Sequence, residues 1–163
     1  MKKMIIVGFL SILFLILDNT LMPFLNIKGV YPSLLLVFAM CYSIINGSWS
    51  GIAIGIFSGA LQDVYLIGAF GINMLLNMLM CLIASKIGEA IFKDKSSIPI
   101  ITCFVLSLLK GVLMFVILYI LKIHFNVKII FLNSIYNAVV AVFMYKRIYK
   151  LCQRKFMVKN WKF

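Results

Sequence analysis

The sequence predicts an all-α, polytopic membrane protein, and three observations carry that prediction. The chain has 163 residues, of which 64% are hydrophobic and 12% charged, with a mean hydropathy of +1.13. Apolar runs close to the length of a membrane-spanning helix follow one another along it. Glycines recur every fourth residue in one of these runs, as they do where two membrane helices pack closely. A soluble domain of this size does not need so much apolar surface.

A membrane-spanning helix needs about 20 apolar residues, and six such spans are predicted. The first carries Asp18 and ends near Pro23, the second is short, and the third carries the glycines. Lys2 and Lys3 precede the first span without a small-residue cleavage site after it, so it is interpreted as an uncleaved span. The six predicted spans are Met4–Phe24, Tyr31–Ile45, Trp49–Ile67, Phe70–Ile87, Ile98–Leu121 and Lys128–Tyr145.

The connections between these spans are short. The turn 68–71 joins the third and fourth spans, and the longest loop is Gly88–Ser97. Residues 1–145 therefore form one six-helix membrane domain, and residues 146–163 form a basic cytoplasmic tail. No soluble domain is predicted.

The distribution of basic residues predicts a multi-pass protein of the cell membrane with both termini in the cytoplasm. With six spans in that orientation, three basic residues lie outside: Lys28, Lys122 and Lys128. Twelve lie inside: Lys2, Lys3, Lys86, Lys93, Lys95, Lys146, Arg147, Lys150, Arg154, Lys155, Lys159 and Lys162. Lys and Arg concentrate on the cytoplasmic side of membrane proteins. The net charge of +12 is thus explained without nucleic acid. The tail either only anchors this topology or also lies on anionic lipids of the inner leaflet.

The glycine stripe consists of Gly47, Gly51, Gly55 and Gly59, and Asp63 follows at the same spacing of four residues. Glycines at this spacing form a groove that lets another helix backbone approach closely. The predicted mechanism is that a partner's single span docks in this groove, and the other possible occupant is a helix of the same bundle. Asp63 is expected about one turn inside the outer end of its span. There it contacts a partner helix or an outward cavity, or is solvated at the membrane interface.

Polar side chains within the other spans are candidates for a buried site. Lys110 lies near the middle of the fifth span, too deep to reach either surface, so it must pair with a group inside the bundle. Asp63, Asn73 and Asn77 are its candidate partners. Asn137, in the sixth span, is expected to hydrogen-bond to a neighbouring helix. A functional role and a structural clasp both remain open for Lys110.

The residues do not predict an enzyme. The sole histidine is His124, and Ser58 lacks the glycine two positions earlier that intramembrane serine proteases carry. The four cysteines, Cys41, Cys81, Cys103 and Cys152, contain no CxxC pair. No metal site, cofactor or catalytic residue is therefore predicted.

The order of several motifs resembles the rod shape-determining protein MreD family. The segment 29–36 contains Pro32 before a Leu-Leu-Leu run, the glycine stripe follows, and Gly68 and Gly71 form the next turn. Tyr136, Asn137 and Ala138 match a late motif, and the resemblance covers nearly the whole chain. Two positions depart from the family pattern: Ser33 replaces an aspartate, and Val142 replaces a common proline.

This resemblance implies a scaffold without enzymatic activity in the cell-elongation machinery of rod-shaped bacteria. It implies binding to MreC, a single-span protein, and through it to MreB, RodA and a class B penicillin-binding protein. The fold it implies is similar to the substrate-binding component of energy-coupling-factor transporters. A vitamin-binding component of such a transporter is the alternative, and it would need an outward pocket with aromatic and polar side chains.

Overall fold

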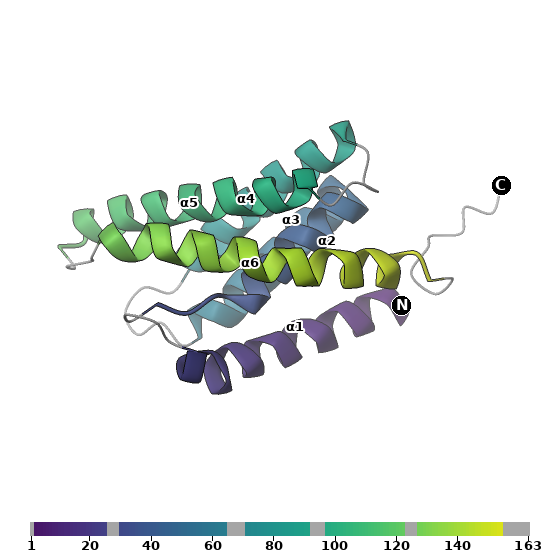
Figure 1. Ribbon diagram of the computed structural model, residues 1–163, viewed down its shortest axis with the longest axis horizontal. Coiled ribbons are helices and arrows are strands. Elements are labelled where there is room, and N and C mark those ends of the chain that lie inside the picture. The colour runs from purple at the N-terminus through teal and green to yellow at the C-terminus, as the bar shows by residue number, and fades with distance from the viewer. Residues whose placement is uncertain (1, 26–29, 65–70, 92–96, 123–126, 155–163) are drawn as a thin grey trace.

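The computed structural model describes residues 2–25, 30–64, 71–91, 97–122 and 127–154, and it is a bundle of six α-helices (Figure 1). The predicted all-helical class is confirmed, and no strand occurs in the described ranges. In chain order the elements are α1 (Lys2–Thr20), the short 3-10 helix η1 (Met22–Leu25), α2 (Leu34–Asn46), α3 (Ser48–Asp63), α4 (Ile72–Ala90), α5 (Ser97–Ile120) and α6 (Val127–Cys152).

The two ends of the bundle contain different helix termini. The start of α1, the end of α6 and the α2–α3 junction lie at one end, which we call the terminal end (Figure 1). The ends of α1, α3 and α5 lie at the opposite end, together with the starts of α4 and α6, and we call it the far end. This arrangement follows from short connections between consecutive antiparallel helices.

Three of the described helices are long and apolar enough to cross a membrane by themselves. They cover Lys3–Phe24, Ile72–Ala90 and Ser97–Ile120, with mean hydropathies of 2.2, 1.3 and 2.5. The α2 helix is apolar but has only 13 residues, about 20 Å at 1.5 Å per residue. The six-span count therefore stays a prediction, although six helices are present.

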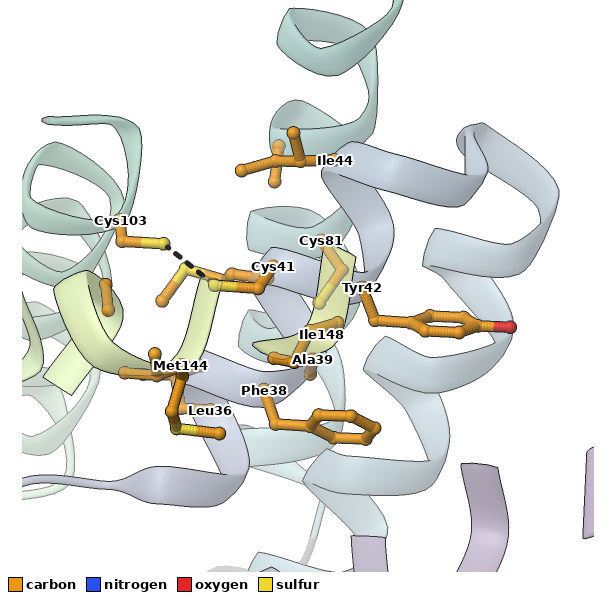
Figure 2. Close-up of a cluster of buried hydrophobic side chains, with 14 of the residues drawn as sticks. Leu36, Phe38, Ala39, Cys41, Tyr42, Ile44, Cys81, Cys103, Met144 and Ile148 are labelled. Atoms are coloured by element: carbon orange, nitrogen blue, oxygen red, sulfur yellow. Dashed lines mark hydrogen bonds between the residues drawn. The ribbon is translucent and has the colours of Figure 1, made fainter. Parts of the chain in front are cut away.

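The central helix of the bundle is α2. Every residue from Leu35 to Ile44 is buried, because α1, α3, α4, α5 and α6 all pack against it. A helix that is apolar on all sides is stable only when it is enclosed. Figure 2 shows this core, in which the thiols of Cys41 and Cys103 lie 3.9 Å apart. All four cysteines are free and buried.

The glycine stripe forms a seam between α3 and α4. A Cβ atom added at Gly55 would lie 2.7 Å from the Cα of Met78, and one at Gly59 would overlap the backbone of Met74. At Gly51 it would lie 3.0 Å from the carbonyl oxygen of Cys81. The groove is thus filled by α4, so of the two predicted occupants the structure has the helix of the same bundle.

Several boundaries differ from the prediction. The third helix ends at Asp63, so this residue is the last of α3 and does not lie one turn inside it. The α4 helix continues to Ala90, which places Gly88 in a helix instead of a loop. Gly88 permits a further close approach, because a Cβ atom there would overlap the backbone of Ile44 in α2. The α6 helix runs past Tyr145 to Cys152.

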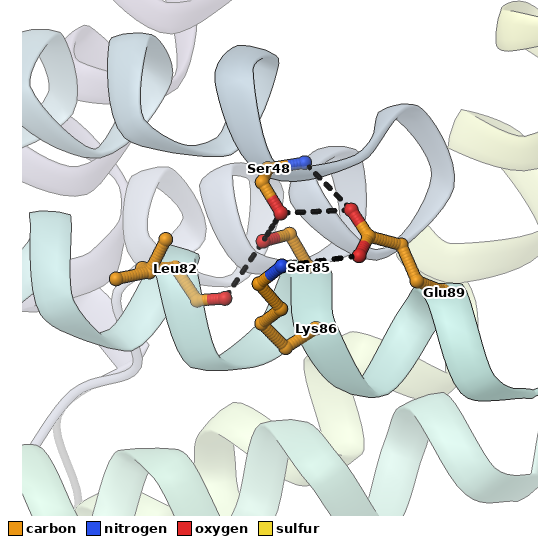
Figure 3. Close-up of polar contacts among 5 residues, drawn as sticks. All are labelled: Ser48, Leu82, Ser85, Lys86 and Glu89. Atoms are coloured by element: carbon orange, nitrogen blue, oxygen red, sulfur yellow. Dashed lines mark hydrogen bonds and ion pairs between the residues drawn. The ribbon is translucent and has the colours of Figure 1, made fainter.

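Three of the four acidic residues of the chain accept hydrogen bonds at the start of a helix other than their own. The carboxylate of Asp18, in α1, accepts the N–H groups of Leu34 (2.7 Å) and Leu35 (3.0 Å) in α2. Glu89, in α4, accepts both the N–H (3.2 Å) and the hydroxyl (2.7 Å) of Ser48 in α3 (Figure 3).

Asp63, in α3, does the same for α4 and is 1% exposed. It accepts the N–H groups of Gly71 (2.9 Å), Asn73 (3.0 Å) and Met74 (2.9 Å). The first N–H groups of a helix lack partners within it, and the helix dipole favours negative charge there. The carboxylates therefore tie consecutive helices together. Asp94, the fourth acidic residue, lies outside the described residues.

Candidate functional site

The α2 helix begins deep within the bundle, and this position creates the candidate site. Residues Val30–Ser33 are not helical and lead into α2, with Val30 and Pro32 buried. Ser33 is the N-cap residue, whose hydroxyl accepts the N–H of Leu36 at 3.3 Å. Non-helical backbone at membrane depth is stable only where protein or a water-filled cavity satisfies it. The α1 and α6 helices supply those groups here.

Asn137 hydrogen-bonds to neighbouring helices, as its position within an apolar span predicts. Its side-chain oxygen accepts the N–H of Ser33 at 2.9 Å, and its NH2 group donates to the hydroxyl of Ser107 in α5 at 3.1 Å. One amide therefore joins α6 to α2 and to α5. Asn137 is 2% exposed, so both of its hydrogen bonds lie in the bundle interior, where an unpaired amide would be costly.

Lys110 donates to Gln62, on α3. The distance from Nζ to Oε1 is 3.2 Å, and the same oxygen accepts the NH2 group of Asn77 at 2.9 Å. The NH2 group of Gln62 in turn donates to the Ser33 hydroxyl at 2.9 Å. Gln62 is thus the centre of a polar network that joins α2, α3, α4 and α5.

The candidate partners of Lys110 can now be placed. Asp63 faces the start of α4, and no carboxylate in the described ranges lies within ion-pair distance of the lysine. Asn77 shares the Gln62 acceptor with Lys110 and also donates to Ser58 at 3.4 Å. Asn73 is buried and donates its backbone N–H to Asp63. The lysine therefore pairs with a neutral amide that was not among its predicted partners.

A cavity of about 490 Å³ lies beside this network, on the side of the far end. Its polar wall contains Asp18, Gln62, Lys110 and Asn133. The side-chain oxygen of Asn133 is buried and has no hydrogen-bond partner within the described part of the chain. The volume falls in the range of about 300–1,000 Å³ that small-molecule sites occupy. The cavity exists because α2 is short, so that the helices around it extend beyond its first turn.

Sequence reasoning missed several residues of this site, among them Gln62, Ser107 and Asn133. Gln62 lies one turn after Ser58 and beside Asp63, so a polar face at the end of α3 was visible in the sequence. Asn133 likewise precedes Asn137 by one turn on α6. Nothing in the sequence singles out Ser107, since a serine can satisfy itself on the preceding turn of its own helix.

The other predicted positions have structural surroundings. Gly47, with φ of 84°, joins α2 to α3, and Gly71, with φ of 100°, precedes α4. Such backbone angles favour glycine. Tyr136 is half-buried on α6 beside Asn137. Gly68, His124 and most of the tail (155–163) lie outside the described residues. The described part of the chain contains no group of three or more metal-binding side chains.

Comparison with known proteins agrees with the resemblance found in the sequence. The family model of the rod shape-determining protein MreD matches residues 2–155. No curated protein and no solved structure matches the chain. The matched range includes all six helices and every residue of the polar network. The chain therefore belongs to the rod shape-determining protein MreD family.

Proposed function

We propose that this protein is a membrane scaffold of the cell-elongation machinery that binds an MreC-like single-span protein. Through that protein it would associate with MreB, RodA and a class B penicillin-binding protein during lateral peptidoglycan synthesis. The family match over residues 2–155 carries the proposal. Membership in this family implies a role in rod shape determination, and proteins of this family act with the MreC and MreB shape machinery.

The geometry supports a binding role over an enzymatic one. The acidic residues that the structure describes cap helices, and the polar side chains of the network hydrogen-bond to one another. The cavity would also suit the alternative, a vitamin-binding transporter component. The family match favours the scaffold.

The partner's span cannot dock in the glycine groove, which was its predicted place. Because α4 fills the glycine groove, the partner's span would have to pack on a lipid-facing surface of the bundle. One exposed apolar residue can be tested on each of four helices: Ile12 on α1, Ile56 on α3, Val112 on α5 and Val139 on α6.

Photo-cross-linking at these positions tests the proposal. We expect a photoreactive residue at one or two of these four positions to capture the single-span protein in native membranes. Identification is by mass spectrometry of the cross-linked product. The fully buried Cys41 position is the matched control and should capture only this chain. If no surface position captures the partner, and mild-detergent purification recovers none, direct binding is wrong.

We further propose that both termini are cytoplasmic, as the basic residues favour. The native cysteines are buried, so introduced cysteines can be labelled with little background. A membrane-impermeant maleimide is expected to label Lys122→Cys, at the far end, in intact cells. It should label Arg154→Cys, at the terminal end, only after lysis. Labelling of Arg154→Cys in intact cells would reverse the topology.

A further inference from the structure

Lys110 is the cation among the described residues that line the cavity. Asp18 also lines it, but this carboxylate faces the start of α2, where the helix dipole offsets its negative charge. Both oxygens of Asp18 accept hydrogen bonds at the start of α2, and Asp18 Oδ2 also accepts the Ser33 hydroxyl at 3.2 Å. The amine of Lys110 has three donors, and the structure shows one of them donating to Gln62. A lysine at this depth without a carboxylate partner is a favourable site for an anion.

The cavity wall also contains an acceptor in need of a donor. Among the described residues the buried oxygen of Asn133 has no hydrogen-bond partner, and leaving a buried polar atom unpaired is costly. A hydroxyl group on a ligand would satisfy it. The polar wall thus offers a cation for an anionic group and an acceptor for a neutral donor.

The remaining wall is apolar, and side chains from helices that do not pack closely against one another form it. Leu15 of α1 faces the cavity together with Met114 of α5 and Ile130 of α6. Within the described residues, α1 packs against η1, α2 and α3 but makes no backbone contact with α5 or α6. In Figure 1, α1 lies along the edge of the bundle. Between α1 and the α5–α6 pair, the cavity is therefore covered by side chains and not by a closely packed pair of helices.

We propose that the cavity binds the phosphate-bearing, hydroxylated headgroup of an anionic membrane lipid that enters between α1 and the α5–α6 pair. The phosphate pairs with the Lys110 amine, and a headgroup hydroxyl donates to the Asn133 oxygen. Leu15, Met114 and Ile130 contact the start of the acyl chains. A lipid suits this wall better than a free anion, because the side chains toward α1 and the α5–α6 pair are apolar.

Native mass spectrometry of the delipidated, full-length protein tests this. Short-chain phosphatidylglycerol is compared with phosphatidylcholine at equal concentration. We expect the wild-type chain to retain one phosphatidylglycerol at least about tenfold more strongly. Both lipids have the phosphate, but only phosphatidylglycerol has headgroup hydroxyls for Asn133, and Lys110 repels the choline cation of phosphatidylcholine. Lys110→Met should lower the retention of phosphatidylglycerol and reduce the preference. Lys86→Met is the matched control, since it removes an exposed charge at the terminal end, and it should keep the preference.

A second variant and a competition experiment with free phosphate complete the test of lipid binding. Met114→Trp should fill the apolar entrance and lower lipid retention while Lys110 is intact, so it replaces Lys110→Met if that variant does not fold. Inorganic phosphate, added alone, should not compete. Equal retention by wild type and a folded Lys110→Met variant would overturn the proposal. So would competition by free phosphate, or displacement of the lipid by an acidic peptide of the partner protein. None of these readouts depends on cell shape or on capture of the single-span protein.

Discussion

Replacing Gly59 with leucine is expected to prevent α3 and α4 from packing and to remove the folded protein from the membrane. Even one added carbon overlaps the backbone of Met74, which cannot move aside as a flexible side chain can. Overpacking a core usually costs about 1–3 kcal/mol, and we expect the cost to exceed that range here. The measurements are abundance in purified membranes and the melting temperature in mild detergent.

The control for this substitution is Gly8→Leu in α1, where an added carbon meets no atom within 4 Å. It should leave abundance and melting temperature unchanged. A graded series sharpens the test, because Gly51 has more room than Gly59. Alanine should therefore be tolerated better at Gly51 than at Gly59. A Gly59→Ala protein as stable as the wild type would show that α3 and α4 are not packed through this stripe.

Hydropathy and glycine spacing predicted much of the fold, because both depend on local sequence. The apolar runs located six helices, and the four-residue step of Gly51, Gly55 and Gly59 predicted the close approach that α3 and α4 make. Hydropathy failed at the start of α2, since Tyr31 and Pro32 are apolar whether or not they are helical. Pro32 followed by Ser33 was the available signal, because serine favours an N-cap position.

The polar site was only partly predictable. Lys110, Asn73, Asn77 and Asn137 stood out because a polar residue within an apolar run is unusual. Their partners depend on which faces meet in the folded bundle, and the sequence does not specify that. Lys110 accordingly bonds to Gln62, which is 48 positions away and attracted no attention beside the charged Asp63.

The carboxylate caps were missed for the same reason. Asp18, Asp63 and Glu89 each lie near the end of one predicted span, where a solvated charge is the ordinary expectation. Their acceptor role appears only when consecutive helices lie antiparallel, so that the end of one helix lies beside the start of the other. This arrangement explains why so apolar a chain keeps these acids.

Replacing Asp18 with leucine is the second substitution expected to have a large effect. It leaves the N–H groups of Leu34 and Leu35 without their acceptor, at a depth where water is scarce. Each unpaired buried group costs about 1–3 kcal/mol, so the bundle should lose about 2–6 kcal/mol of stability. The expected results are a lower melting temperature and release of the far end of α1, measured by hydrogen exchange of α1 and α2. Asn19→Leu is the control, because Asn19 is exposed and its side chain bonds only within α1.

The reason to test Asp18 is Ser33, the position at which the resemblance described above implies an aspartate. In this chain a carboxylate still reaches the start of α2, but it comes from α1. We therefore expect Ser33→Asp to restore much of the stability lost in Asp18→Leu, since aspartate caps a helix about as well as serine and adds the missing charge.

In the wild-type background the same Ser33→Asp substitution should destabilise the protein. It would replace a hydroxyl that donates to Asp18 at 3.2 Å with a second carboxylate. A double-mutant cycle measures this change of sign. If Ser33→Asp has the same effect in both backgrounds, the two positions act independently, and Asp18 does not serve as the carboxylate of the α2 cap.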